Sequence, residues 1–404
     1  MMDDSGRRRA MGVYLDHAAS TPLRPEAREA WLAAAELTGN ASSVHGAGQA
    51  ARRVLEDARE RIAAVLGCDP IEVVFTSGGT ESVNLGVKGL WWAREPDRSA
   101  IVLPDGEHHA TLDTVEWLAA AQGAQVRPVP LDQEGAIDAD AFAAVLPGAA
   151  LATALVANNE VGTVSDVARL AAAAADAAVP LHLDAVGAIA HTPIDFAALR
   201  GTGNAPHGLV AASVSGHKVG APVGTGALVV SRFARIGAVL HGGGQQRGLR
   251  SGTPDVAGAA AVAVALELTA AERDAESPRL TALAGRLADG IRRVVPGARL
   301  LGSPDRRLPG HVHVLFPDAL GETLLFLLDH SGVEVSTGSA CQAGIAEPSH
   351  VVMALGYGDR EARSVLRITL GRSSTADDVD AFLAALPDAH RRAAASSARA
   401  AARS

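Results

Sequence analysis

Short runs of apolar and β-branched residues alternate along the chain with longer stretches in which apolar residues recur at helical spacing. The longer stretches predict helices, for example at 47–66 and 167–178. The short runs predict strands at 71–75, 101–103, 152–156, 181–183, 209–213 and 226–230. This alternation is typical of an α/β fold, in which helices cover both faces of a mostly parallel sheet.

The order of predicted elements changes near residue 270. A long helix is predicted at 277–294, and strands at 311–316, 334–336 and 366–370 follow it with helices between them. We interpret this part as a smaller α+β domain. The predicted organisation is an N-terminal segment at 1–20 that packs with the small domain, a large domain at 21–270, a small domain at 271–388 and a tail at 389–404.

The tail is rich in Ala, Arg and Ser and lacks large apolar side chains, which predicts a frayed or disordered end. The apolar stretch at 257–268 is shorter than the roughly 20 residues that span a bilayer, so we expect a buried helix and no membrane association. A formal net charge of −9 argues against nucleic acid as a partner and favours small molecules and proteins.

The two cysteines, Cys68 and Cys341, lie far apart, which is typical of a reducing compartment. The segment after Arg9 does not read as the apolar core of a signal peptide. We therefore expect a cytoplasmic protein.

The strongest chemical signal is Ser213-Val-Ser-Gly-His-Lys218, which follows a predicted strand and precedes a Gly-rich run at 219–226. A lysine on a turn at the end of a strand, beside hydroxyl and imidazole donors, suits an aldehyde cofactor that carries a phosphate. Lys218 would form the Schiff base with it. The alternative is a surface lysine in a polar turn.

A second signal lies at 75–82, where a β-rich run stops at two glycines and a helix begins near Thr80. Exposed backbone N–H groups and the positive end of the helix would hold a dianionic phosphate, and the Thr80 hydroxyl adds a donor. An ordinary Gly-Gly turn before a helix is the alternative.

Three further polar residues follow predicted strands. Asp184 would pair with a pyridinium nitrogen, His108 rather than His109 would stack on the ring and move protons, and Asn159 would bond the phenolic oxygen or the substrate. The alternatives are a helix cap for Asp184, a structural role for each histidine and a turn for Asn159.

Cys341 lies in a segment of small residues, 336–349, which predicts a mobile loop with an accessible thiol. A thiol in that setting can act as a nucleophile, whereas most lone cysteines are buried and inert. Cys68 has no comparable setting, and we interpret it as structural.

In this order the segments resemble the cysteine desulfurases of the class-V aminotransferase family, on the branch with a Ser-Gly-Ser-Ala-Cys-type loop. The resemblance covers nearly the whole chain, and it rests on the ordered set rather than on any one motif. Besides the segments above, it includes 14–22, 39–45, 241–253 and 365–372.

The resemblance implies a fold-type I homodimer that binds pyridoxal 5′-phosphate in its large domain. It places Arg367 on the substrate carboxylate, a role that suits a planar guanidinium fork. The ring would be held by His108, Asn159, Asp184 and Lys218. The phosphate would be held by Gly79, Thr80, Ser215 and His217, with Thr253 reaching in from the partner subunit.

The implied reaction converts L-cysteine to L-alanine. Lys218 or His108 would move protons, and the Cys341 thiolate would take the substrate sulfur as a persulfide. The implied partner is a sulfur-acceptor protein such as an iron–sulfur scaffold, and the acceptor could equally serve tRNA thiolation or another biosynthetic pathway. No resident metal is expected, although a transient iron–sulfur contact at Cys341 is compatible with the chemistry.

The chain departs from the family pattern at Gly187, where relatives usually carry a glutamine that donates to the phenolic oxygen. Asn159 or a water molecule would have to compensate. Two alternative functions stay open: another enzyme of this scaffold, such as a selenocysteine lyase, an aminotransferase or a β-eliminating lyase, and a catalytically weak scaffold for sulfur acceptors.

Overall fold

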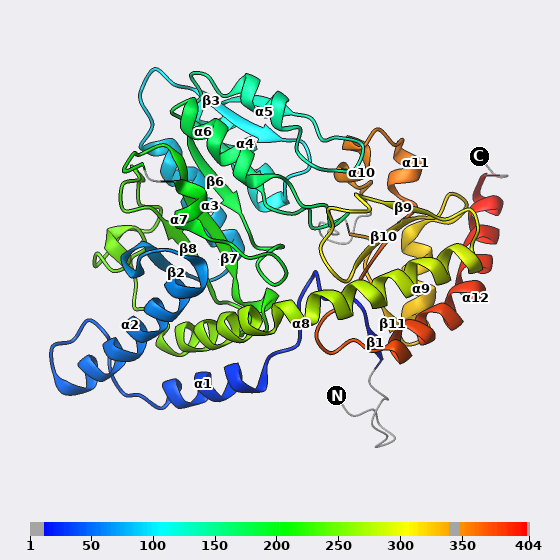
Figure 1. The fold of residues 1–404 in the computed structure, drawn as a ribbon, viewed down its shortest axis with the longest axis horizontal. Coiled ribbons are helices and arrows are strands. Elements are labelled where there is room, and N and C mark those ends of the chain that lie inside the picture. The colour runs from blue at the N-terminus through cyan, green and yellow to red at the C-terminus, as the bar shows by residue number, and fades with distance from the viewer. Residues whose placement is uncertain (1–11, 202, 339–346, 402–404) are drawn as a thin grey trace.

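The computed structural model describes residues 12–201, 203–338 and 347–401. Its main feature is a seven-stranded sheet in the order β2-β8-β7-β6-β5-β3-β4 (Figure 1). Strands β4, β3, β5, β6 and β7 run parallel, whereas β8 is antiparallel to both β7 and β2. The strands span Val73–Thr76 (β2), Ala100–Pro104 (β3), Gln125–Val129 (β4), Leu151–Leu155 (β5), Pro180–Asp184 (β6), Gly208–Ser215 (β7) and Gly226–Val230 (β8). The mostly parallel α/β class is therefore confirmed.

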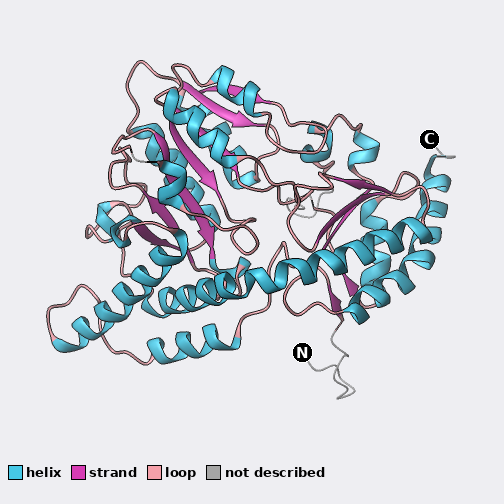
Figure 2. Cartoon of the chain, in the orientation of Figure 1, coloured by secondary structure: helices cyan, strands magenta, loops and turns pink. Residues whose placement is uncertain are grey.

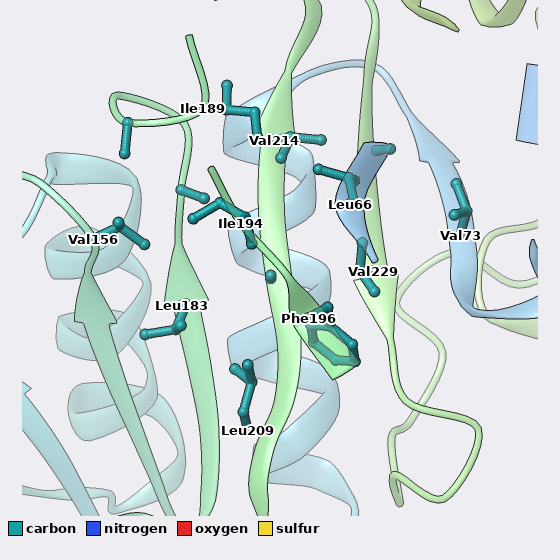
Figure 3. Close-up of a cluster of buried hydrophobic side chains, with 14 of the residues drawn as sticks. Leu66, Val73, Val156, Leu183, Ile189, Ile194, Phe196, Leu209, Val214 and Val229 are labelled. Carbon is teal, nitrogen blue, oxygen red and sulfur yellow. The ribbon is translucent and has the colours of Figure 1, made fainter. Parts of the chain in front are cut away.

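Helices cover both faces of this sheet (Figure 2). On one face, side chains of α2, α6, α7 and α8 form the largest apolar cluster with the sheet, and Figure 3 shows Leu66, Phe196 and Val229 within it. On the other face, α3 and α4 form a second cluster around the buried Trp91. These helices span Gly46–Leu66 (α2), Gly79–Trp92 (α3), His109–Gln122 (α4), Val167–Asp176 (α6), Phe196–Arg200 (α7) and Val256–Val294 (α8), with α1 at Pro25–Ala35 and α5 at Ala139–Val145.

A smaller sheet, in the order β12-β10-β9, is built from the C-terminal part of the chain. Its strands are antiparallel, and a separate apolar cluster joins them to α8, α9 and α12. Strand β1 pairs in parallel with β11 beside this cluster, so the N-terminal segment lies against the C-terminal part. The elements span Val13–Tyr14 (β1), Arg299–Leu301 (β9), His311–Leu315 (β10), Gly321–His330 (α9), Val333–Glu334 (β11), His350–Ala354 (α10), Asp359–Ala362 (α11), Val365–Thr369 (β12) and Ala376–Ala401 (α12).

Helix α8 connects the two parts. It runs without interruption for 39 residues and joins the predicted helices at 257–268 and 277–294 into one, although Pro278 lies inside it. Figure 1 shows it extending from beneath the larger sheet to the smaller one. The first half of α8 packs in the large apolar cluster and the second half in the small one, so the predicted boundary at residue 270 falls inside a helix.

The tail differs from the prediction. Helix α12 continues to Ala401, and Ala389 and Ala393 are buried in the small cluster. The expectation of a disordered segment from residue 389 is therefore wrong for residues 389–401. The reason is that alanine, with a small side chain and the highest helix propensity, packs closely against a neighbouring surface without needing a large apolar group.

No helix in the described part of the chain is long and apolar enough to cross a membrane.

Candidate active site

The polar residues singled out in the sequence meet at one edge of the large sheet. Strands β3, β5, β6 and β7 are parallel, so their carboxyl ends lie together. Asp184 is the last residue of β6, and Lys218 ends a short 3₁₀ turn that directly follows β7. His108 caps the helix after β3, and Asn159 lies in the loop after β5. An open α/β sheet places its ligands at this edge.

Lys218 is held by the N-terminal segment. Its Nζ donates to the carbonyl oxygens of Ala18 and Ala19, at 3.0 Å for Ala19. Burial lowers the pKa of Lys218 to about 8, and the positive charge of Arg367 adds to this effect against the opposing Asp16 and Asp184 carboxylates. An amine with this pKa is unprotonated in a substantial fraction of molecules near neutral pH, which an amine needs to attack an aldehyde.

Asp184 ends β6, the middle strand of the large sheet, and is 2% exposed. Its Oδ1 accepts from the Val186 N–H at 2.9 Å. Burial raises the pKa of Asp184 to about 6, while the Val186 bond and the Lys218 charge act in the opposite direction. A buried carboxylate with one donor has remaining acceptor capacity, which suits a cationic ring nitrogen.

His108 is a neutral base in this arrangement. Its Nδ1 accepts from the Ala110 N–H at 3.0 Å, so a proton on that nitrogen would break the bond. The pKa of His108 is lowered to about 4. Desolvation is the main cause, and the charge of Lys218 also contributes. The neutral ring therefore carries its own proton on Nε2, where it can donate it, and Nδ1 accepts a proton only when the bond from Ala110 opens.

Asn159, Gly187 and Lys218 line one cavity. The Asn159 Oδ1 is buried and has no hydrogen-bond partner among the described residues. A buried amide oxygen without a partner is costly, so a bound group that donates to it, or an amide flip that presents the nitrogen, would satisfy the position. A Cβ at Gly187 would lie 3.7 Å from the Ala157 carbonyl oxygen, so backbone crowding does not explain the glycine.

The predicted phosphate-binding residues converge at the start of helix α3. Gly79 is its first residue. The N-cap residue before it is Gly78, which has no side chain to cap the helix. A Cβ at Gly79 would lie 3.5 Å from the Cβ of Ser215, which ends β7. Free N–H groups and the positive helix end make this junction suitable for a phosphate.

Two more predicted phosphate ligands flank the same junction. Thr80 is exposed on the first turn of α3. His217 lies beside Lys218, and its Nδ1 is 3.3 Å from the Ser20 hydroxyl. Burial, with a contribution from Lys218, lowers the pKa of His217 to about 4, so this ring is neutral and can donate one N–H.

Arg367 extends from β12 toward the same site and is 5% exposed. Its Nη1 donates to the Asn159 carbonyl oxygen at 3.0 Å, and its Nη2 donates to the Asp16 carboxylate at 2.8 Å. Its Nε has no partner among the described residues. The fork therefore keeps unused donors for a further carboxylate.

The structure places neither of two further predicted site residues in the site. Thr253 is exposed, and among the described residues no hydrogen bond joins it to Lys218, Asp184 or the start of α3 in its own chain. Cys341 lies outside the described residues. Cys68 is half-buried, and burial raises the pKa of its thiol to about 12, which agrees with a structural cysteine.

The sequence did not single out several groups that the structure adds. Asp16 contacts Arg367 across 351 positions, so no local spacing signals the contact. The Ala18 and Ala19 carbonyls act through backbone atoms that any residue would supply. Glu107 is 1% exposed, and burial, with the charge of Asp184, raises its pKa to about 8. Asp16 belongs to the 14–22 motif, which was the one available signal.

These residues fit pyridoxal phosphate. Asn159 Oδ1 has no partner in the described structure, Asp184 is a buried carboxylate with spare capacity, and Lys218 has a depressed pKa. The uncapped start of α3 fits the phosphate. The residues at this edge of the sheet thus match an aldehyde, a ring nitrogen and a dianion, which are the three functional groups of the cofactor.

Comparisons with known proteins agree with this chemistry. The model of the class-V aminotransferase family matches residues 13–382. An IscS-like cysteine desulfurase of Mycobacterium tuberculosis is 46% identical over 388 residues, which are 94% of this chain and 97% of that protein. Cysteine desulfurase IscS of Methanosarcina thermophila is 38% identical, and the match covers 93% of this chain and 91% of that protein.

Solved structures give the same result. A NifS-like protein superposes with a TM-score of 0.86 at 32% identity and covers 94% of this chain and 99% of that one. DndA from Streptomyces lividans gives a TM-score of 0.74 at 31% identity, over 88% of this chain and 99% of that one. The resemblance found in the sequence is thus confirmed: the chain belongs to the pyridoxal-phosphate-dependent cysteine desulfurases of the class-V aminotransferase family.

Proposed function

We propose that this protein is a cysteine desulfurase that converts L-cysteine to L-alanine and carries the sulfur as a persulfide on Cys341. The observation that supports this most strongly is the position of Lys218. Its charge lowers the pKa of His108, and its own pKa is lowered by Arg367 and raised by Asp184. An amine, a base, a buried carboxylate and a carboxylate-binding cation at one site are what amino-acid chemistry on an aldehyde cofactor requires.

In this proposal, Lys218 holds the cofactor aldehyde and Asp184 faces the ring nitrogen. Gly79, Thr80, Ser215 and His217 hold the phosphate, and Asn159 faces the phenolic oxygen. When bound, pyridoxal phosphate withdraws electrons from the amino acid and so allows the bonds at its carbon atoms to break. Asp184, ionised at neutral pH because its pKa is about 6, keeps the ring nitrogen protonated and so supports this withdrawal.

Substrate binding and proton transfer fall to other residues. Arg367 binds the substrate carboxylate through donors that Asp16 and Asn159 leave unused. Lys218 or His108 moves the proton between the substrate carbon and nitrogen. The Lys218 amine can be unprotonated near neutral pH, and the neutral His108 ring can exchange its Nε2 proton.

Sulfur transfer then involves Cys341. Its thiolate forms a bond to the substrate sulfur while the bond between that sulfur and the substrate Cβ breaks. The Cβ takes up a proton, and the amino acid leaves as L-alanine. The sulfur remains on Cys341 as a persulfide, so electrons balance without an external oxidant.

The complete site would need two chains. Thr253 is exposed on its own chain and so is available to a partner subunit, in which the family resemblance implies that it completes the phosphate site of a homodimer. The persulfide would pass to a sulfur-acceptor protein such as an iron–sulfur scaffold, in the cytoplasm.

The test is to incubate the purified holoenzyme with L-cysteine and a reductant and to quantify sulfide and alanine together. We expect equal amounts of both from the wild type and from Cys68→Ala, and neither from Cys341→Ala. Cys68 is the matched control because it is the other cysteine of the chain. Full sulfide release by Cys341→Ala would exclude the persulfide mechanism, and bound cofactor without sulfide from the wild type would exclude the activity.

A further inference from the structure

Asp16 is the one carboxylate that contacts the proposed substrate-binding arginine in the described structure. The Arg367 Nη2 and the Asp16 Oδ1 are 2.8 Å apart. The two side chains are 6% and 18% exposed, so little water screens the pair. Asp16 thus presents to Arg367 the same chemical group that an amino-acid substrate would present.

The pair also fixes the orientation of the guanidinium group. Asp16 holds one terminal nitrogen of Arg367, and the Asn159 carbonyl oxygen holds the other at 3.0 Å. A guanidinium group has five donor hydrogens, so these two bonds leave three. Arg367 can therefore keep Asp16 while it binds a second carboxylate.

Asp16 is itself held firmly against the strand that carries Arg367. Its neighbour Ala18 donates from its main-chain N–H to the Thr369 Oγ1 at 2.9 Å, and Asp16 forms a backbone bridge with Thr369. Tyr14 closes the turn from the other side, because its hydroxyl donates to the Ser20 carbonyl oxygen at 2.7 Å. Both members of the pair are thus anchored to β12.

The same turn reaches Lys218 through the carbonyl oxygens of Ala18 and Ala19. The turn that carries Asp16 thus contacts both the residue that would hold the cofactor and the residue that would hold the substrate carboxylate. The electrostatics agree with this position, since Arg367 lowers the pKa of Lys218 and Asp16 raises it. One carboxylate therefore compensates charge for both cations.

We propose that Asp16 is a positioning residue that sets the affinity of the site for the α-carboxylate of an amino acid, by orienting the Arg367 guanidinium and by cancelling part of its charge. The inference rests on the proposed function, in which Arg367 binds that carboxylate. Orientation strengthens binding and charge compensation weakens it, so the two contributions have opposite signs and can be separated.

Two substitutions separate them. Asp16→Asn keeps an oxygen that accepts from Arg367 but removes the negative charge, so we expect carboxylate binding to become about three- to tenfold tighter. Asp16→Ala removes the acceptor as well and releases one end of the fork, so we expect binding about tenfold weaker than in the wild type. Asp16→Glu keeps the charge and shows whether the longer side chain is tolerated.

The measurement is a titration of the holoenzyme with L-alanine, followed by the absorbance of the bound cofactor, and a second titration with L-alaninamide. The amide has the same amino group and side chain but no carboxylate, so a change in general site structure would affect both ligands alike. Glu267→Gln is the matched control variant, because Glu267 is likewise a carboxylate that pairs with an arginine, Arg61, and its two bonds involve neither Asp16 nor Arg367. Thermal unfolding and cofactor content establish that each variant is folded.

The inference predicts tighter L-alanine binding in Asp16→Asn, weaker binding in Asp16→Ala, unchanged L-alaninamide binding in both, and no change in Glu267→Gln. It is wrong if both Asp16 variants bind L-alanine like the wild type, or if L-alaninamide shifts by the same factor. If Asp16→Ala loses its cofactor, the comparison of Asp16→Asn with the wild type decides. A wild-type spectrum that does not respond to L-alanine would instead overturn the proposed function, and the inference with it.

Discussion

The Nζ of Lys218 donates a hydrogen bond to the carbonyl oxygen of Ala19 at 3.0 Å. The lysine thus depends on a segment that lies almost 200 positions earlier in the chain, and its amine is held at the edge of the sheet before any cofactor binds. Two carbonyl oxygens stabilise an ammonium, whereas burial and Arg367 oppose it, and the balance lowers the pKa to about 8.

This balance predicts how the apo protein captures pyridoxal phosphate. Only the unprotonated amine attacks an aldehyde, so the capture rate should rise with pH and reach half of its maximum near the pKa of about 8, below the value of 10.5 for an ordinary lysine. The rate is measured from the absorbance of the bound cofactor at a series of pH values.

The chain offers a matched control, because it has two lysines, Lys88 and Lys218. Lys88 lies on α3 with its Nζ 4.7 Å from the centre of the Trp117 ring. We expect Lys88→Ala to capture the cofactor as the wild type does and Lys218→Ala to capture none covalently. Borohydride reduction followed by peptide mass spectrometry identifies the modified lysine, and modification of Lys88 would contradict the assignment.

A glutamine at position 187, the residue that the family resemblance leads us to expect there, should change the cofactor spectrum. A Cβ there would lie at ordinary contact distances, 3.7 Å from the Ala157 oxygen and 3.9 Å from the Asn159 Cβ, so a side chain can be attached without a clash at its first carbon. A donor to the phenolic oxygen favours its charged form, so Gly187→Gln should lower the pH midpoint of the absorbance change by about one unit, a hydrogen bond to a charged group contributing about 1.5 kcal/mol.

Gly187→Leu is the control, since leucine has a similar size and no donor. It should leave the midpoint near the wild-type value. An equal shift in both variants would mean that exclusion of water, and not a hydrogen bond, sets the midpoint. No shift in Gly187→Gln would mean that another group already supplies the donor.

Cys68 should resist alkylation in the folded protein. Burial raises the pKa of its thiol to about 12, so the reactive thiolate is about one part in ten thousand at pH 8. Iodoacetamide labelling of the Cys341→Ala variant, analysed by mass spectrometry, should modify Cys68 slowly under native conditions and rapidly in denaturant. Rapid native labelling would show that the thiol is accessible.

Helix α12 should contribute to stability beyond residue 389. Ala393 is 0% exposed in the small apolar cluster, so Ala393→Asp would bury an unpaired charge and lower the free energy of unfolding by about 3 kcal/mol. Ala398 is exposed on the same helix, and Ala398→Asp should cost less than about 1 kcal/mol. Urea midpoints compare the two, and equal midpoints would mean that the end of α12 does not pack.

The hydrophobic pattern predicted the strands that are buried in the sheet. β8 was predicted with its observed bounds, and β5 and β6 within a residue or two, because each is a short segment dominated by apolar residues and fully or almost fully buried. Strand β4 was not predicted. It lies at the edge of the sheet, most of its residues are exposed or half-exposed, and it contains Pro128, so neither an apolar run nor an alternation marks it.

The tail shows a second limit of the pattern. Sequence reasoning takes burial from large apolar side chains, and residues 389–401 have none. Their helix forms because alanine favours helix and because the neighbouring apolar surface is already in place. A contact surface supplied by other elements is not visible in the segment that uses it.

The sequence by itself determined the class of the fold, the family and the identity of the residues with chemistry, because strand periodicity and side-chain type are local properties. Tertiary structure alone decided how those residues act. The pKa of Lys218 depends on burial and on Arg367, and the orientation of Arg367 depends on Asp16, 351 positions away. Desolvation and charge interactions depend on distance in space, and folding sets that distance between residues whose spacing along the chain carries no information about it.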